Sequence, residues 1–185
     1  ATYIGDYAFA YTSLTNVDLS SAEYIGSLAF AKESLTEFAV VLGENIQSFG
    51  ENPFAYCDLE AFSSFEVIEF NGKEYRVPTY TFDINDNVKV INGSLYFKVP
   101  YGLEYVCFAG DSNTEYVADD TVRISAYAFA GSHIKSVVLP YTLNSIGHKA
   151  FYDCSNLSRV TFTSYEAPIL EEEYDMTYFE SFDNI

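Results

Sequence analysis

Cysteine thiolates and histidine imidazoles are the side chains best suited to nucleophilic catalysis and metal binding. Cys57, Cys107 and Cys154 lie far apart and form no C-x-x-C pair, so the chain has no zinc-finger spacing. Cys57 and Cys154 each follow a phenylalanine by three residues, at Phe54 and Phe151. A nucleophile has no reason to recur at a structural period, so we predict that these thiols pack inward. Cys107 lies in an apolar run and is expected to be buried too, and no disulfide is required by the spacing.

The two histidines occupy variable positions and form no recognisable catalytic or metal-binding pair. His133 and His148 belong to no H-E-x-x-H motif and to no i, i+4 pair, and both are expected at the surface. The chain also has no G-x-S-x-G motif and no glycine loop of the kind that binds phosphate. No nucleophile, base and orienting group can be assembled from these residues, so we predict no catalytic residues, no cofactor and no enzymatic activity.

Carboxylates could bind calcium, and the densest group of them lies near the C-terminus. This group lacks the alternating D-x-D-x-D-G loop that calcium sites use, so we expect no metal site. The segment 164–185 is instead expected to be an acidic cap on the end of the fold. The acidic group consists of Glu171, Glu172, Glu173 and Asp175.

The net charge limits the classes of partner. The chain has 27 acidic and 9 basic residues, a formal charge of −18. Such a charge repels phosphate backbones, so nucleic acid and anionic membrane surfaces are not expected partners. No apolar run is long enough to span a bilayer, and no signal peptide is visible. Because the first residues already fit a repeat, we expect a mature or excised fragment.

The secondary-structure elements that position these residues are encoded by a sequence pattern that repeats along the chain. Ile124 to Ile146 and Phe129 to Phe151 are both separations of 22 positions. A repeat of this length indicates a solenoid, in which each unit buries its apolar edge against its neighbours.

The N-terminal third carries the same pattern. Phe9 to Phe30 is 21 positions and Phe30 to Phe54 is 24 positions. We therefore predict regular repeats over 1–64 and 123–163. Four glycines recur at the period and are expected to occupy turns that need special backbone angles. They are Gly5, Gly26, Gly50 and Gly147.

Each unit divides into two kinds of local structure. The piece L-x-x-V-x-L alternates apolar and polar positions, which is typical of a strand with one buried face. The piece I-G-x-x-A-F spaces its apolar residues three to five apart, which favours one helical turn or a 3-10 segment. We therefore predict an α/β, β-rich solenoid with a parallel sheet on one side and short helical or 3-10 turns on the other.

Between residues 65 and 122 the pattern becomes irregular. Asn71-Gly72 and Asn92-Gly93 are each flanked by β-branched and aromatic residues, which predicts two hairpins with type I′ turns. No linker rich in proline, glycine or serine brackets this segment, so we expect degenerate repeats within a single domain, 1–185.

The repeated string resembles the leucine-rich repeat of BspA-type surface proteins of bacteria and some protists. Ile146-Gly147, Ala150-Phe151, Cys154 and Leu157 match its I-G-x-x-A-F-x-x-C-x-x-L portion best, and Leu139-Pro140 with Leu143 supplies an L-P-x-x-L portion. The resemblance implies a leucine-rich-repeat solenoid that is secreted or located at the cell surface. It also implies adhesion or binding to a host or matrix protein.

The positions marked x in L-x-x-V-x-L point away from the core and could carry a binding surface. If the sheet runs through all coils, the residues at these positions line up on its outward face, where they are acidic in the N-terminal coils and basic in the C-terminal coils. We hypothesise that this strip contacts a protein ligand; scattered solubilising charges are the simpler interpretation. The candidate residues are Asp18, Glu37, Glu60, Lys135 and Arg159.

Two other functions stay open at this point. A carbohydrate-binding surface would use exposed tyrosine rings as stacking platforms, with Tyr96, Tyr101 and Tyr105 as candidates. A structural spacer would only hold another domain away from a cell wall. A non-catalytic extracellular binding module for proteins is the function that we expect first.

Overall fold

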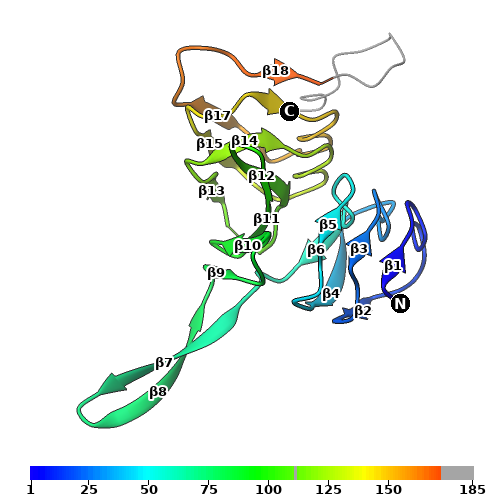
Figure 1. Ribbon diagram of the computed structural model, residues 1–185. Coiled ribbons are helices and arrows are strands. Elements are labelled where there is room, and N and C mark those ends of the chain that lie inside the picture. Colours follow the sequence, from blue (N-terminus) through cyan, green and yellow to red (C-terminus); the bar gives the residue numbers. More distant parts are fainter. Residues whose placement is uncertain (111, 172–185) are drawn as a thin grey trace.

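The computed structural model describes residues 1–110 and 112–171 (Figure 1), and these residues form strands and turns with no helix. The strands of successive coils stack side by side along two separate parts of the molecule, one N-terminal and one C-terminal. A long hairpin projects between them. The parallel sheets of a solenoid are therefore confirmed, whereas the predicted helical or 3-10 side is wrong.

The N-terminal part contains two small parallel sheets. One consists of β1 (Tyr3–Ile4), β3 (Tyr24–Ile25) and β5 (Ser48–Phe49). The other consists of β2 (Asn16–Leu19), β4 (Thr36–Leu42) and β6 (Cys57–Leu59). The coils therefore contribute one strand to each sheet.

The C-terminal part repeats this arrangement. Its parallel strands are β12 (Gly102–Cys107), β14 (Thr121–Ile124), β16 (Ser145–Ile146) and β18 (Ile169–Leu170) in one sheet, and β13 (Thr114–Tyr116), β15 (Ser136–Leu139) and β17 (Arg159–Phe162) in the other. Ile124 lies opposite Ile146, and Val137 lies opposite Val160. The first pair is separated by 22 positions and the second by 23, because the segment from Ile146 to Val160 is one residue longer than that from Ile124 to Val137. The period read from the sequence thus corresponds to the pairing of these strands, with one extra residue in the last coil.

Residues with a left-handed backbone conformation, with positive φ, explain why the I-G-x-x-A-F segment forms turns and not a helix. In the first coil Ala8 N–H donates to the Gly5 carbonyl at 3.2 Å, which closes a turn, but Tyr7 has a φ of 56°. A residue in this conformation ends a right-handed helix. The amides of Tyr7 and Phe9 donate instead to carbonyls of the second coil, Ser27 at 3.0 Å and Ala29 at 2.7 Å. Other non-glycine residues with positive φ at these turn positions are Tyr11, Leu28, Tyr56, Tyr127, Lys149 and Asp153.

Three of the four recurring glycines, Gly26, Gly50 and Gly147, serve close stacking, which corrects the prediction of an unusual backbone angle. A Cβ at Gly147 would lie 2.3 Å from the Ala126 backbone nitrogen, and one at Gly26 would lie 2.5 Å from the Asp6 nitrogen. None of the four recurring glycines is among the residues with positive φ. Glycine is needed here because one coil passes over the backbone of the previous one.

The predicted hairpins are both present in the irregular middle. The first consists of β7 (Ser64–Phe70) and β8 (Lys73–Thr79), and the second of β10 (Val88–Ile91) and β11 (Ser94–Val99). The strands β9 (Phe82–Asp83), β10, β11 and β12 form an antiparallel meander, and β12 then pairs in parallel with β14. The first hairpin extends away from the body of the molecule.

Stacked phenylalanines form the core of each part. Phe30 and Phe54 have ring centroids 5.8 Å apart, and Phe129 and Phe151 have centroids 4.8 Å apart in a nearly parallel arrangement. All three cysteines are free and buried, which confirms the prediction that they pack inward. Burial raises the pKa of the Cys57 thiol to about 12 and raises that of Cys154 as well, so neither is a thiolate at neutral pH.

One arginine joins the two parts at their junction. Arg123, in β14, donates to Glu51 of the third coil at 2.8 Å and to Glu171 at 2.7 Å, and it also pairs with Glu104 of β12. Glu51 in addition accepts the Ala126 N–H at 2.8 Å. These charge-assisted bonds link segments far apart in the sequence.

Candidate binding surface

The acidic candidates lie on the outward face of the β2–β4–β6 sheet and are all exposed. Glu37 in β4 lies directly opposite Asp58 in β6, which places two carboxylates side by side. Asp18 lies opposite Val41, and Glu60 follows the end of β6. The 21-residue spacing of Phe9 and Phe30 would place Glu37 opposite Asn16, whereas in the structure Ala39 lies opposite Asn16. Val17 likewise lies opposite Val40 and not opposite Phe38.

Two adjoining hollows open on this sheet. They share Phe38, Ala39, Leu59 and Ala61, so they form one groove. Its acidic lining residues are Glu37, Asp58 and Glu60, and its further apolar lining includes Val41, Phe62, Phe82 and Ile84. Among the described residues, no lysine or arginine lines it. Below we call this the acidic groove.

Asp18 is held in its ionised form by local hydrogen bonds. The Ser20 backbone N–H donates to its carboxylate at 2.9 Å. This bond, together with the Ser20 hydroxyl, lowers the pKa of Asp18 below its ordinary value. Asp18 is therefore a permanent negative charge at neutral pH, beside Val41 on the same sheet.

The basic candidates lie on a different sheet, which corrects the idea of one continuous strip. Lys135 precedes β15 and Arg159 begins β17, and both side chains are exposed. Arg159 lies opposite Ser136, and the Lys135 carbonyl accepts the Ser158 N–H at 2.9 Å. Because β13–β15–β17 and β2–β4–β6 are separate sheets, the acidic and basic residues form two patches.

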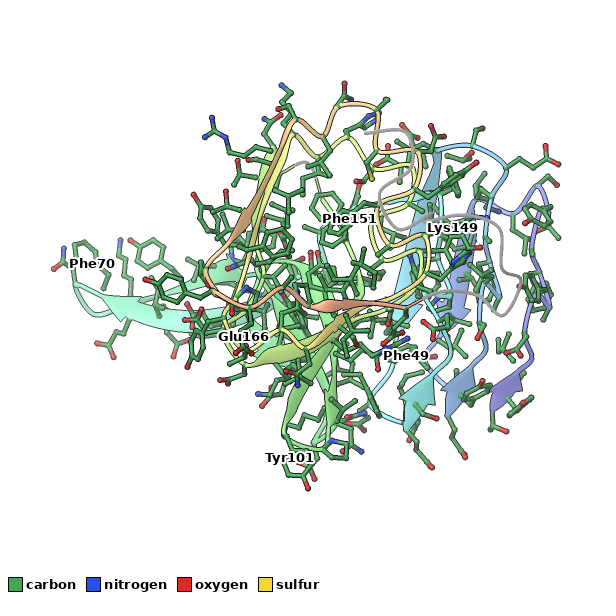
Figure 2. All side chains as sticks on the ribbon, turned by 90° about the horizontal axis from the view of Figure 1, so that it is seen from above. Phe49, Phe70, Tyr101, Lys149, Phe151 and Glu166 are labelled. Carbon is green, nitrogen blue, oxygen red and sulfur yellow. The ribbon has the colours of Figure 1, made fainter. Side chains whose placement is uncertain are left out.

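The tyrosines suggested for stacking against a glycan are mostly in the core. Tyr96 and Tyr105 are fully buried, with their rings 4.8 Å apart edge to face. The Tyr105 hydroxyl donates to the buried Glu115 carboxylate at 2.9 Å. Tyr101 is fully exposed on the turn between β11 and β12 (Figure 2). The prediction of a three-ring platform is therefore wrong, since only one of its rings can meet a ligand.

The structure describes both histidines but only one residue of the acidic cluster. His133 is exposed as predicted, whereas His148 is half-buried with its ring 5.9 Å from that of Tyr127. Glu171 bonds to Arg123, and Glu172, Glu173 and Asp175 lie outside the described residues. Within the described ranges, no group of three or more histidine, cysteine, aspartate or glutamate side chains could hold a metal ion.

Two acidic residues of structural importance were not singled out from the sequence. Asp58 follows Cys57 within a repeat, whereas the L-x-x-V-x-L pattern begins at Leu59 here and so assigns the outward strand positions to the residues after it. Glu115 occupies a position where the next two coils have Val137 and Val160. A polar residue at a valine position of the repeat was the signal that could have identified it.

Residues 1–110 and 112–171 contain no helix that is long and apolar enough to cross a bilayer.

Three solved structures share the fold of this chain. It is similar to the pneumococcal vaccine antigen PcpA, with a TM-score of 0.56 and 17% identity, over 88% of this chain and 43% of that one. A leucine-rich cell-surface protein of Faecalibacterium prausnitzii gives 0.54 and 17%, over 88% and 33%. A leucine-rich repeat protein of Eubacterium ventriosum gives 0.52 and 14%, over 87% and 45%. The chain therefore spans less than half the length of each of these structures.

Comparison with curated proteins gave no significant match. Residues 2–99 and 101–183 match the BspA type leucine-rich repeat region, in six copies. The resemblance expected from Ile146-Gly147 and Ala150-Phe151 is thus confirmed over most of the sequence. The chain belongs to the BspA-type leucine-rich repeat family.

Proposed function

We propose that this chain is a non-catalytic protein-binding module that works at the cell surface or outside the cell. The family of surface proteins to which it belongs supports this location, as does the cell-surface protein of F. prausnitzii among its structural neighbours. Binding through a wide exposed sheet is a function that stacked repeats serve well, because their outward positions vary without disturbing the core.

The acidic groove is the proposed contact surface. The paired carboxylates of Glu37 and Asp58 carry this proposal, since they stand on an exposed sheet face beside an apolar floor. Like charges held side by side are unfavourable in the free protein, so a cationic partner gains by neutralising both. The apolar floor gives the partner's side chains a surface to bury. The chemistry fits an extended, lysine- or arginine-rich segment of a host or matrix protein.

Lys135 and Arg159 are proposed as a second contact for the same ligand or another one. They lie at neighbouring positions on the β13–β15–β17 sheet. A ligand that reaches both sheets would place its acidic portion here. Charge reversal at both residues should weaken binding of such a ligand, and unchanged affinity would remove this second contact from the proposal.

The experiment is a binding screen of the purified chain against extracellular-matrix proteins, with a glycan array in parallel. The variant Glu37→Lys/Glu60→Lys should lower affinity for a protein ligand by roughly tenfold or more, since two rim charges change sign. Glu166→Lys is the matched control, because Glu166 is exposed and lies in the C-terminal part. Equal loss in both variants, or binding only to glycans, would contradict the acidic groove as the contact surface.

A further inference from the structure

The β7–β8 hairpin presents apolar side chains to solvent on both faces. Phe65, Val67 and Phe70 are 55%, 65% and 63% exposed. Figure 2 shows Phe70 near the tip of the hairpin, far from the body. An isolated two-stranded hairpin is marginally stable in water, and three or more strands are usually needed. The exposed residues therefore call for a partner strand.

The turn determines which backbone groups of the hairpin point outward. Asn71 and Gly72 have φ values of 52° and 70°, which is a two-residue type I′ turn between the paired Phe70 and Lys73. This turn makes Phe70 and Lys73 a hydrogen-bonded pair, and the pairs then alternate along the ladder. Every second residue of each strand consequently directs its N–H and C=O away from the hairpin.

The N–H and C=O groups that point away from the hairpin make β7 the edge with which a further strand can pair. On β7 they belong to Phe65, Val67 and Glu69. On β8 one of the outward positions is Pro78, opposite Phe65, which has no N–H to donate. Within the described residues, backbone bonds outside the strand ladders include none from Phe65 to Phe70. An approaching strand can therefore pair along β7 and is hindered along β8.

In a single hairpin, two carboxylates lie opposite each other and the arginine does not compensate their charge. Glu69 lies directly opposite Glu74 in a pair that is not hydrogen-bonded, where side chains are closest. Like charges in this position destabilise a strand pair. The one arginine of the hairpin, Arg76, does not relieve them, because its guanidinium lies 4.5 Å from the centroid of the Phe65 ring.

We propose that β7 of one molecule pairs antiparallel with β7 of a second copy, so that two hairpins form a four-stranded sheet. A twofold register with Val67 opposite Val67 of the second copy also puts Phe65 opposite Glu69. It pairs all three outward residues of each edge, about six backbone bonds in total. Glu66 then faces Ile68 of the second copy, and no carboxylate lies directly opposite another carboxylate across the new edge.

Charge complementarity supports a second copy as the occupant. In this register Glu69 lies opposite Phe65 of the second copy. The guanidinium of Arg76 packs over that Phe65 ring, so it lies close to Glu69. Each Glu69 thus gains a cation that compensates for Glu74. The two acidic bodies attach at opposite ends of the shared sheet. Six residues of strand separate these ends by roughly 20 Å, about two Debye lengths, so their repulsion is largely screened.

Sedimentation velocity of the purified chain over about 5 to 500 µM tests the proposal. The wild-type mass should rise from 20.8 kDa toward twice that value. Val67→Pro removes an outward N–H without touching the β7–β8 ladder, and should weaken the dimer by roughly tenfold or more because the change occurs twice. Glu74→Pro makes the same change on the β8 edge and should leave the dimer intact. A wild type that stays monomeric throughout, or equal loss in both variants, overturns the proposal.

A charge exchange separates dimerisation from folding of the hairpin. Glu69→Arg relieves the repulsion with Glu74 within one hairpin but faces Arg76 of the second copy. This variant should therefore keep its hairpin and lose dimer affinity. Adding Arg76→Glu restores opposite charges across the edge and should restore the dimer. Unchanged affinity in the single variant, or no recovery in the double variant, contradicts the proposed register.

Discussion

Glu115 should make the stability of this protein fall as the pH rises from about 4.5 to about 7. The residue is only 3% exposed and stands in β13, opposite Val137. Burial disfavours its ionised form and raises its pKa from 4.5 to about 7, although the hydrogen bond from Tyr105 acts in the opposite direction. The other titratable groups that interact with it, Tyr96 and Tyr105, have pKa values raised above 10 and stay neutral in this range.

The sign and size of the effect follow from proton binding. Between pH 4.5 and 7 the folded state holds a proton that the unfolded state releases, so the free energy of unfolding decreases as the pH rises. The contribution is complete below pH 4.5 and lost above pH 7. A shift of about 2.5 pKa units corresponds to about 3 kcal/mol. That is a large share of the roughly 5–15 kcal/mol that stabilises a typical domain.

Urea denaturation followed by circular dichroism, at pH values from 5 to 8.5, measures this contribution. Glu115→Gln keeps a hydrogen-bond acceptor for Tyr105 but cannot ionise, so subtracting its curve from that of the wild type isolates Glu115 from the other acidic residues. The variant should be close to the wild type at pH 5 and more stable by up to about 3 kcal/mol at pH 8. A difference curve that is flat over this range would refute the assignment of a raised pKa to Glu115.

Three further substitutions, two of them paired with a control substitution, test the packing of the coils. Gly147→Ala should lower the melting temperature because its Cβ would meet backbone at 2.3 Å, whereas Gly5→Ala, with only a side-chain atom at 3.9 Å, should change it little. Phe129→Ala removes a fully buried ring and should cost about 3–5 kcal/mol in urea denaturation, against a much smaller loss for the 41%-exposed Phe9→Ala. Arg123→Gln leaves three carboxylates at the junction without their shared cation, so it should destabilise the protein by about 1–3 kcal/mol and the loss should shrink as salt is added.

The apolar period could be predicted from the sequence because the same contact is made in each coil. The stacking of Phe129 on Phe151 requires phenylalanine at a fixed interval, so the interval is visible in the chain itself. The hairpins were predictable for a similar reason, since Asn71-Gly72 and Asn92-Gly93 meet a local need for positive φ.

The turn conformations and the strand register could not be predicted from the sequence. Tyr7 and Leu28 adopt positive φ although neither residue type favours it, so a helical turn was predicted where hydrogen bonds between coils dominate. Val17 lies opposite Val40, 23 positions on, although Phe9 and Phe30 are 21 apart. Glu37 lies opposite Asp58, 21 positions on, although Phe30 and Phe54 are 24 apart. Both outcomes depend on contacts between coils, which local preferences do not encode.

A column of side chains shows how the irregular middle fits into the solenoid. Asp6 accepts the Ser27 N–H at 2.8 Å, the Ser27 hydroxyl accepts the Glu51 N–H at 3.0 Å, and Glu51 accepts the Ala126 N–H at 2.8 Å. The first two steps join coils 21 and 24 residues apart, and the third spans 75 residues.

The turn of the third coil is therefore followed in space by the turn at Ala126. Asn52, which donates to the Tyr127 carbonyl at 2.6 Å across the same 75 residues, makes the same connection. On the turn side these two coils stack directly, although the β7–β8 hairpin and the meander lie between them in the sequence. The meander contributes Val88, Leu95 and Tyr105 to the core, whereas the exposed β7–β8 hairpin can lengthen or change its sequence while the turn column keeps its hydrogen bonds. The hairpin can therefore expose an apolar edge strand. The inner strands of the regular coils cannot do so, because each is hydrogen-bonded to a neighbouring coil on both sides and exposing an edge would break that stacking.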